Sequence, residues 1–83
     1  MIDLFNNFSE IDKNYLIKDI EELSELIKEI AKFFNDQGSI ENLIEEFADS
    51  MTAIEHIRKL FNINDKEIEN IHKRKGVYKK YEK

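Results

Sequence analysis

Two pairs of carboxylates are the residues of this sequence whose types and spacing are suited to chemistry. Glu22 and Glu25 form the first pair, and Glu46 and Asp49 form the second. Residues three positions apart lie on one face of an α-helix, so each pair would present its two carboxylates together. Carboxylate oxygens are the ligands that hard divalent cations such as Mg²⁺ and Mn²⁺ prefer. The pairs therefore predict a metal site, provided that the fold brings them together.

Two long helices, predicted from the spacing of apolar residues, carry these pairs. The first runs from about Glu10 or Asn14 to Phe34, and its apolar positions recur at intervals of four and three residues. They are Leu16, Ile20, Leu23, Ile27, Ile30 and Phe34. The second runs from an N-cap at Ser39 to about Phe61. Its apolar stripe contains Ile40, Leu43, Ile44, Phe47, Met51, Ile54, Ile57 and Phe61. We expect both stripes to form the core.

A short turn and a third helix complete the predicted fold. Residues 35–38, Asn-Asp-Gln-Gly, separate the two long helices, and so short a connection makes them an antiparallel hairpin. Asn64 and Glu67 resemble a capping box that starts a short third helix, which carries Ile68 and Ile71 and pauses at Gly76. The predicted class is all-α, with residues 1–83 as a single domain.

The antiparallel arrangement places both acidic pairs on one flank of the hairpin. At about 1.5 Å per residue, each pair lies roughly 9–14 Å from the turn, so the pairs are level. At about 100° per residue, each is displaced from the apolar stripe of its helix by similar angles in the same direction. Glu46 and Asp49 also have no Lys or Arg three or four residues away. Crowded carboxylates repel one another, and a divalent ion would relieve that repulsion. Either pair alone is more simply explained as solvated surface charge.

The acidic motifs together resemble the signature of a known family. Glu-Glu-x-x-Glu at residues 21–25, followed after 20 residues by Glu-x-x-Asp at residues 46–49, resembles the all-α nucleoside triphosphate pyrophosphohydrolases, the MazG and dimeric dUTPase group. The aliphatic context of residues 20–26 and 44–49 is also similar. The resemblance covers roughly residues 15–75, and the small MazG-like members that are often found in phages look closest.

The resemblance implies a role for each acidic residue. Glu22, Glu25, Glu46 and Asp49 would be ligands of Mg²⁺, or of Mn²⁺, and Glu21 would be an accessory carboxylate that orients a ligand or the attacking water. The implied reaction hydrolyses a nucleoside triphosphate to the monophosphate and pyrophosphate. The implied assembly is a helical bundle, a dimer or tetramer, whose active site is completed across a subunit boundary.

Basic residues near the C-terminus are the candidates for holding the substrate phosphates. Lys73, Arg74, Lys75 and Lys79 lie where the family tends to place Lys and Arg after its third helix.

The chain departs from the family near the N-terminus, where the His or Gln with an aromatic residue that many members use near the base is absent. Aromatic residues such as Phe8 either contribute to a base pocket or pack on the bundle, and packing is the simpler interpretation. His56 is expected on the surface.

Length and charge limit the remaining possibilities. A chain of 83 residues buries only about 60% of its unfolded surface. One hairpin with a short third helix cannot cover two long apolar stripes, so we expect a second copy to complete a four-helix-type bundle as a homodimer or homotetramer. Residues 1–71 hold 7 Lys and Arg against 17 Asp and Glu, a balance of −10, whereas residues 72–83 hold 6 against 1, a balance of +5. An acidic body with a basic C-terminal segment argues against a nucleic-acid-binding module.

Other classes of site and location are excluded more simply. There is no Cys, which excludes thiolate zinc sites and Cys nucleophiles. No apolar run approaches the roughly 18 residues that span a bilayer, and the first residues lack the features of a signal peptide, so no membrane partner and a cytoplasmic location are expected. Two non-enzymatic functions stay open. One is a helical interaction or regulatory module that retains the fold without catalysis, and the other is a purely structural coiled-coil-like dimer.

Overall fold

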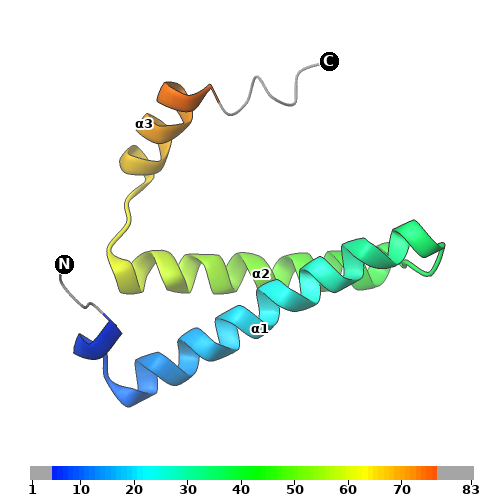
Figure 1. The fold of residues 1–83 in the computed structure, drawn as a ribbon, viewed down its shortest axis with the longest axis horizontal. Coiled ribbons are helices and arrows are strands. Elements are labelled where there is room, and N and C mark those ends of the chain that lie inside the picture. Colours follow the sequence, from blue (N-terminus) through cyan, green and yellow to red (C-terminus); the bar gives the residue numbers. More distant parts are fainter. Residues whose placement is uncertain (1–4, 77–83) are drawn as a thin grey trace.

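The computed structural model describes residues 5–76, which form three α-helices and two single-turn 3-10 helices (Figure 1). The α-helices are α1 (Glu10–Lys32), α2 (Ile40–Phe61) and α3 (Asp65–Lys75). The 3-10 helices are η1 (Phe5–Asn7), before α1, and η2 (Phe33–Asn35), directly after it. No strand occurs between residues 5 and 76, so the predicted all-α class is confirmed. Within this range no helix is both long enough and apolar enough to cross a membrane.

Each α-helix begins at a polar side chain that caps its first turn. Ser9, Ser39 and Asn64 each accept a hydrogen bond from the backbone N–H three residues later, at 3.1, 3.3 and 2.8 Å. These bonds satisfy amide groups that have no partner within the helix. The predicted caps at Ser39 and Asn64 are therefore confirmed, and the start of α1 is fixed at Glu10 rather than Asn14.

The helix ends and the turn use the left-handed backbone conformation. Asp36, Asn62 and Gly76 have φ values of 57°, 61° and 59°, and each follows the end of a helix. Asn, Asp and Gly tolerate this conformation better than other residues, so they end the helices there. Gly38 has a different role in the turn, because a Cβ at this position would lie only 2.5 Å from the ring of Phe33.

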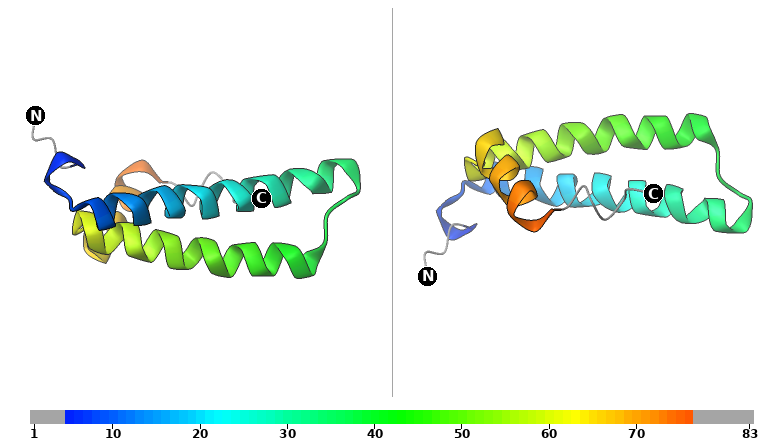
Figure 2. Two further views of the ribbon diagram at one scale, coloured as in Figure 1. Left: turned by 90° about the horizontal axis from the view of Figure 1, so that it is seen from below. Right: turned by 90° about the horizontal axis from the view of Figure 1, so that it is seen from above.

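α1 and α2 run antiparallel, side by side, and are joined at one end by the turn (Figure 2). We call the line of contact between them the seam, defined by their buried residues. These are Leu16, Asp19 and Glu29 from α1 and Ser50 and Ala53 from α2. The Ser50 hydroxyl donates a hydrogen bond to the backbone carbonyl of Glu22 at 3.2 Å, which fixes the register of the two helices. The predicted hairpin is therefore present.

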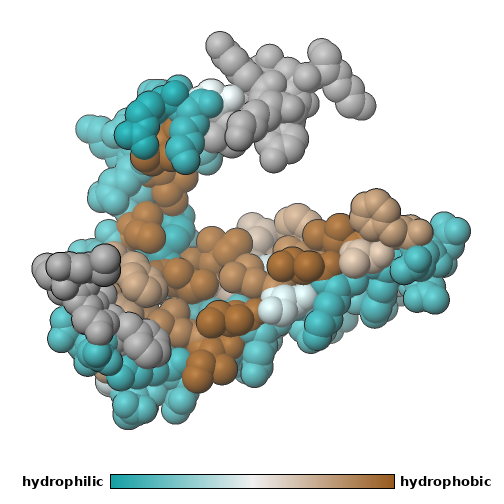
Figure 3. Space-filling model, in the orientation of Figure 1, coloured by the Kyte–Doolittle hydropathy of each residue, from teal (hydrophilic) through white to brown (hydrophobic). Residues whose placement is uncertain are grey.

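The apolar stripes lie mostly beside the seam, so the single chain leaves most of the predicted core residues exposed. Ile20, Phe34 and Met51 are 61%, 87% and 65% exposed. Ser50 and Ala53 are small and let the helix backbones approach, whereas the bulky side chains are displaced to one flank. We call these exposed side chains the apolar band (Figure 3). Its members are Ile20, Ile27, Ile30, Phe34, Ile40, Ile44, Phe47, Met51 and Ile54.

α3 stands away from the hairpin at its open end (Figure 1). Among the described helices only α1 and α2 pack extensively against each other. An ion pair between Arg58 of α2 and Asp65 of α3 spans the connection. The radius of gyration is 15.9 Å, whereas a compact domain of this length has about 12 Å. The single chain is thus too open to enclose a core of its own.

Candidate metal centre

Three of the four predicted metal ligands come together beside the seam. Glu22 of α1 and Glu46 and Asp49 of α2 each offer one carboxylate oxygen, and these oxygens lie within 4.8 Å of one another. Oxygens that bind one divalent cation at about 2.0–2.6 Å are at most about 4–5 Å apart. We call these three residues the acidic group. Their spacing is that of a site which small side-chain movements would close around a cation.

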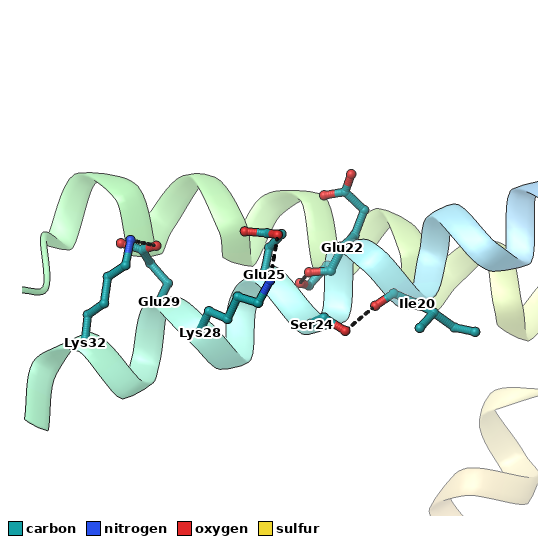
Figure 4. Close-up of polar contacts among 8 residues, drawn as sticks. Ile20, Glu22, Ser24, Glu25, Lys28, Glu29 and Lys32 are labelled. Atoms are coloured by element: carbon teal, nitrogen blue, oxygen red, sulfur yellow. Dashed lines mark hydrogen bonds and ion pairs between the residues drawn. The ribbon is translucent and has the colours of Figure 1, made fainter.

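Glu25 lies next to the acidic group without belonging to it. Its carboxylate pairs with Lys28 at 3.5 Å. Figure 4 shows the side chains of Glu22, Glu25 and Glu29 projecting from one side of α1, as their spacing of three and four residues requires. The predicted metal ligand Glu25 therefore occupies the same flank and stands one helical turn closer to the hairpin turn.

The electrostatics of the acidic group are those of crowded negative charges. Partial removal from solvent raises the pKa of the Glu46 carboxyl, and the charges of Asp49 and Glu25 raise it further. The charges of Glu22 and Glu45 act in the same direction. Among residues 5–76, no ion pair joins a member of the acidic group to a Lys or Arg. The repulsion is therefore uncompensated, and a divalent cation would stabilise the arrangement.

The structure does not bring the other predicted site residues to the acidic group. Glu21 is exposed and is not one of the three clustered carboxylates, because one residue along a helix turns the side chain by about 100°. Lys73, Arg74 and Lys75 lie in the last turn of α3, away from the hairpin, and Lys73 pairs with Glu69 at 3.1 Å. Lys79 lies outside the described residues.

A pocket of about 350 Å³ adjoins the acidic group on the side away from the turn. Glu22 and Asp49 line one part of it, and Tyr15, Asp19 and His56 line another. The pocket and the acidic group therefore share two carboxylates. Both lie on the flank of the seam opposite the apolar band, because on each helix the two sets of residues diverge from the seam in opposite directions.

A buried carboxylate and an imidazole form the far side of the pocket. Asp19 is only 7% exposed, and its Oδ2 pairs with Nδ1 of His56. The Tyr15 ring meets the His56 ring edge-on, with the ring centres 5.8 Å apart. His56 was expected on the surface, and its side chain is 35% exposed, but its pairing with Asp19 holds it against the edge of the seam.

Sequence reasoning missed two carboxylates at the seam. Asp19 lies three residues before Glu22, a spacing that would have placed it on the same face. Glu29 lies four residues after Glu25 and is 6% exposed. One oxygen of Glu29 pairs with Lys32 at 3.1 Å, and the other is buried without a hydrogen-bond partner. We call this side of the hairpin, with the acidic group, Asp19, Glu25 and Glu29, the acidic flank. It extends along α1 beyond the two predicted pairs.

Comparisons of this chain with models of protein families, with curated proteins and with solved structures found no match. The similarity of its acidic motifs to the pyrophosphohydrolases is therefore carried by the residues of the motifs alone.

Proposed function

We propose that this protein is a divalent-metal-dependent nucleoside triphosphate pyrophosphohydrolase, which converts a ribo- or deoxynucleoside triphosphate and water into the monophosphate and pyrophosphate. The observation that carries the proposal is the acidic group, in which Glu22, Glu46 and Asp49 meet without a compensating cation. The same three residues belong to the motifs that resemble the family. Geometry and resemblance thus favour the same chemistry.

In the proposed reaction, different residues of the acidic flank bind the metal and accept the proton. Glu22, Glu46 and Asp49 would hold Mg²⁺ or Mn²⁺, which when bound neutralises phosphate charge and lowers the pKa of water. Glu25 lies on the same side of α1 as Glu22, whereas the side chain of Glu21 is turned from Glu22 by about 100°. Glu25 is therefore the better placed of the two to accept the proton of the attacking water.

A second copy of the chain is proposed to cover the apolar band. Its nine side chains are 44–87% exposed, which amounts to about 1,000 Å² if each offers up to about 200 Å². A stable interface buries about 800 Å² per partner, whereas exposed apolar patches on monomers are typically a few hundred Å². Two hairpins joined in this way would make the four-helix-type bundle, as a homodimer or as half of a homotetramer.

The basic residues of α3 are proposed to reach the substrate phosphates only in this assembly. α3 shares little contact with the hairpin, so a different placement of α3 in the oligomer costs little. Lys73, Arg74 and Lys75, with Lys79 beyond the described residues, would then supply the positive charge that the acidic flank lacks. This separation of cations from carboxylates in the single chain also favours a second function, a regulatory module that binds a nucleotide or a protein without catalysis.

Pyrophosphate release distinguishes the two functions. The assay uses a panel of nucleoside and deoxynucleoside triphosphates with Mg²⁺, with Mn²⁺ and with EDTA. Metal-dependent release by the wild type that is lost in Glu22→Gln and Asp49→Asn, with helical circular dichroism intact, supports the enzyme. Glu45→Gln is the matched control, because Glu45 is an exposed neighbour outside the acidic group. No release by folded, oligomeric wild type would support the non-catalytic module instead.

A further inference from the structure

We propose that the pocket beside the acidic group holds the nucleoside part of the substrate, with Tyr15 and His56 contacting the base and Asp19 fixing the orientation of His56. The inference rests on the proposed function for the identity of the ligand as a nucleotide. Its structural basis is a pocket lined on one side by the buried Asp19 carboxylate and its half-buried partner His56, and this basis is independent of whether the nucleotide is hydrolysed.

The pocket adjoins the acidic group in the same way that the nucleoside of a nucleotide adjoins its phosphates. Glu22 and Asp49 belong to both the acidic group and the pocket lining. A ligand whose phosphates meet a cation at those carboxylates therefore directs its next group into the pocket. His56 lies seven residues beyond Asp49 on α2, about 10 Å along the helix axis. The volume of about 350 Å³ lies at the small end of the range of about 300–1,000 Å³ for small-molecule sites.

The charge of the lining favours a neutral ring over a further anion. Asp19, Glu22 and Asp49 are acidic, and Lys18 is the one Lys or Arg among the described lining residues. A free phosphate in the pocket would face this excess of negative charge without a bound cation between them. A base carries no formal charge and offers hydrogen-bonding groups at its edge. The pocket thus complements the part of a nucleotide that the cation does not hold.

The side chains on the far side of the pocket are suited to a flat heterocycle. Ala53 lines the pocket, and its small side chain leaves room for a ring beside α2. Tyr15 is 54% exposed, which leaves ring surface for stacking. Nδ1 of His56 is engaged by Asp19, so Nε2 is the nitrogen that remains for a ligand. Phe8, the N-terminal alternative, already packs edge-on against Phe61 with the ring centres 5.2 Å apart.

Nuclear magnetic resonance of the full chain in Mg²⁺ tests the inference without requiring turnover. The probes are CMP, UMP, AMP and GMP, with inorganic phosphate as the comparison. We expect at least one monophosphate to shift the His56 ring and Ala53 methyl resonances, and inorganic phosphate to leave both unchanged. We expect His56→Ala to weaken that binding at least tenfold and to leave Mg²⁺ affinity within twofold, whereas His72→Ala, the matched control on α3, changes neither.

Two further readouts separate the role of each residue. Asp19→Asn is expected to change the tautomer of His56 seen in ¹⁵N spectra, which a merely structural role would not require. In turnover, His56→Ala is expected to raise KM at least tenfold and to change kcat less than threefold. Monophosphates that fail to bind, or that bind without shifting His56 and Ala53, overturn the inference, as does an unchanged KM in His56→Ala. Binding at His56 without pyrophosphate release from any triphosphate overturns the proposed function and leaves the pocket assignment standing.

Discussion

Replacing Asp49 by Asn is predicted to reverse the order of stability between wild type and variant when a divalent metal is added. In metal-free buffer the charge of Asp49 repels Glu46 and Glu22, whose oxygens lie within 4.8 Å of its own, and it helps to raise the pKa of Glu46. Asn removes that charge with little change in size or helix propensity. The variant is therefore expected to melt above the wild type in EDTA.

When a divalent metal binds the acidic group, the wild type is expected to become more stable than the Asp49→Asn variant. Metal at one hundred times its Kd adds about 2.7 kcal/mol to the free energy of unfolding. For a domain of this size each kcal/mol raises Tm by about 4–8 °C, so the expected shift is about 10–20 °C. If the loss of one of three carboxylates weakens metal binding one hundredfold, the same concentration adds only about 0.4 kcal/mol to the variant, or about 2–3 °C.

Thermal melting followed by circular dichroism, in EDTA and in a series of Mn²⁺ concentrations, measures both effects. Glu45→Gln is the matched control, because Glu45 also acts on Glu46 but lies outside the acidic group. It should gain stability slightly in EDTA and keep the full metal response. A wild-type Tm that is the same in EDTA and in Mn²⁺, or an Asp49→Asn variant that responds like the wild type, would refute the metal centre.

Three further changes test other parts of the structure. The pKa of Glu46 in the folded state is raised above the ordinary value of 4.5, so in EDTA the folded protein binds more protons near this pH than the unfolded chain does. The free energy of unfolding should therefore fall as pH rises through and above that value. Urea unfolding at pH 4–7 measures this fall, and Glu46→Gln should remove it. If the proposed oligomer forms through the apolar band, Phe47→Asp should shift it to monomer in light scattering and lower Tm, whereas an unchanged mass would argue against the proposed interface. Gly38→Ala forces the Phe33 ring to move and should cost about 1–3 kcal/mol in urea unfolding.

The helix ends could be predicted from the sequence because they depend on local hydrogen bonds. Ser39 and Asn64 satisfy amide groups only three residues away, and Gly76 supplies the left-handed residue that ends α3. The proximity of Glu22 to Asp49 could also be predicted from the sequence. A short turn fixes the relative height of two antiparallel helices, and helix geometry fixes the direction of each side chain. Both quantities follow from counting residues.

The packing face of each helix could not be predicted in the same way. The apolar stripes are wide enough to pack at several rotations, and the choice depends on the size of the groups that meet. Ser50 and Ala53 allow close approach, and the hydroxyl of Ser50 binds the Glu22 carbonyl from 28 residues away. The pairing of Asp19 with His56 joins residues 37 positions apart, and neither is part of a spaced motif. Such contacts become visible only when the rotation of both helices is known.

From the position of the acidic flank, the proposed metal binding is expected to raise the stability of the whole hairpin. Closing the seam buries Asp19, which pairs with His56, and Glu29, which pairs with Lys32. It also brings together the acidic group, which no described Lys or Arg offsets. A cation on this flank and a second copy on the apolar band would stabilise the same closed hairpin from opposite sides. Each would therefore bind more tightly when the other is present, because any ligand of the folded hairpin raises the population that the other one needs.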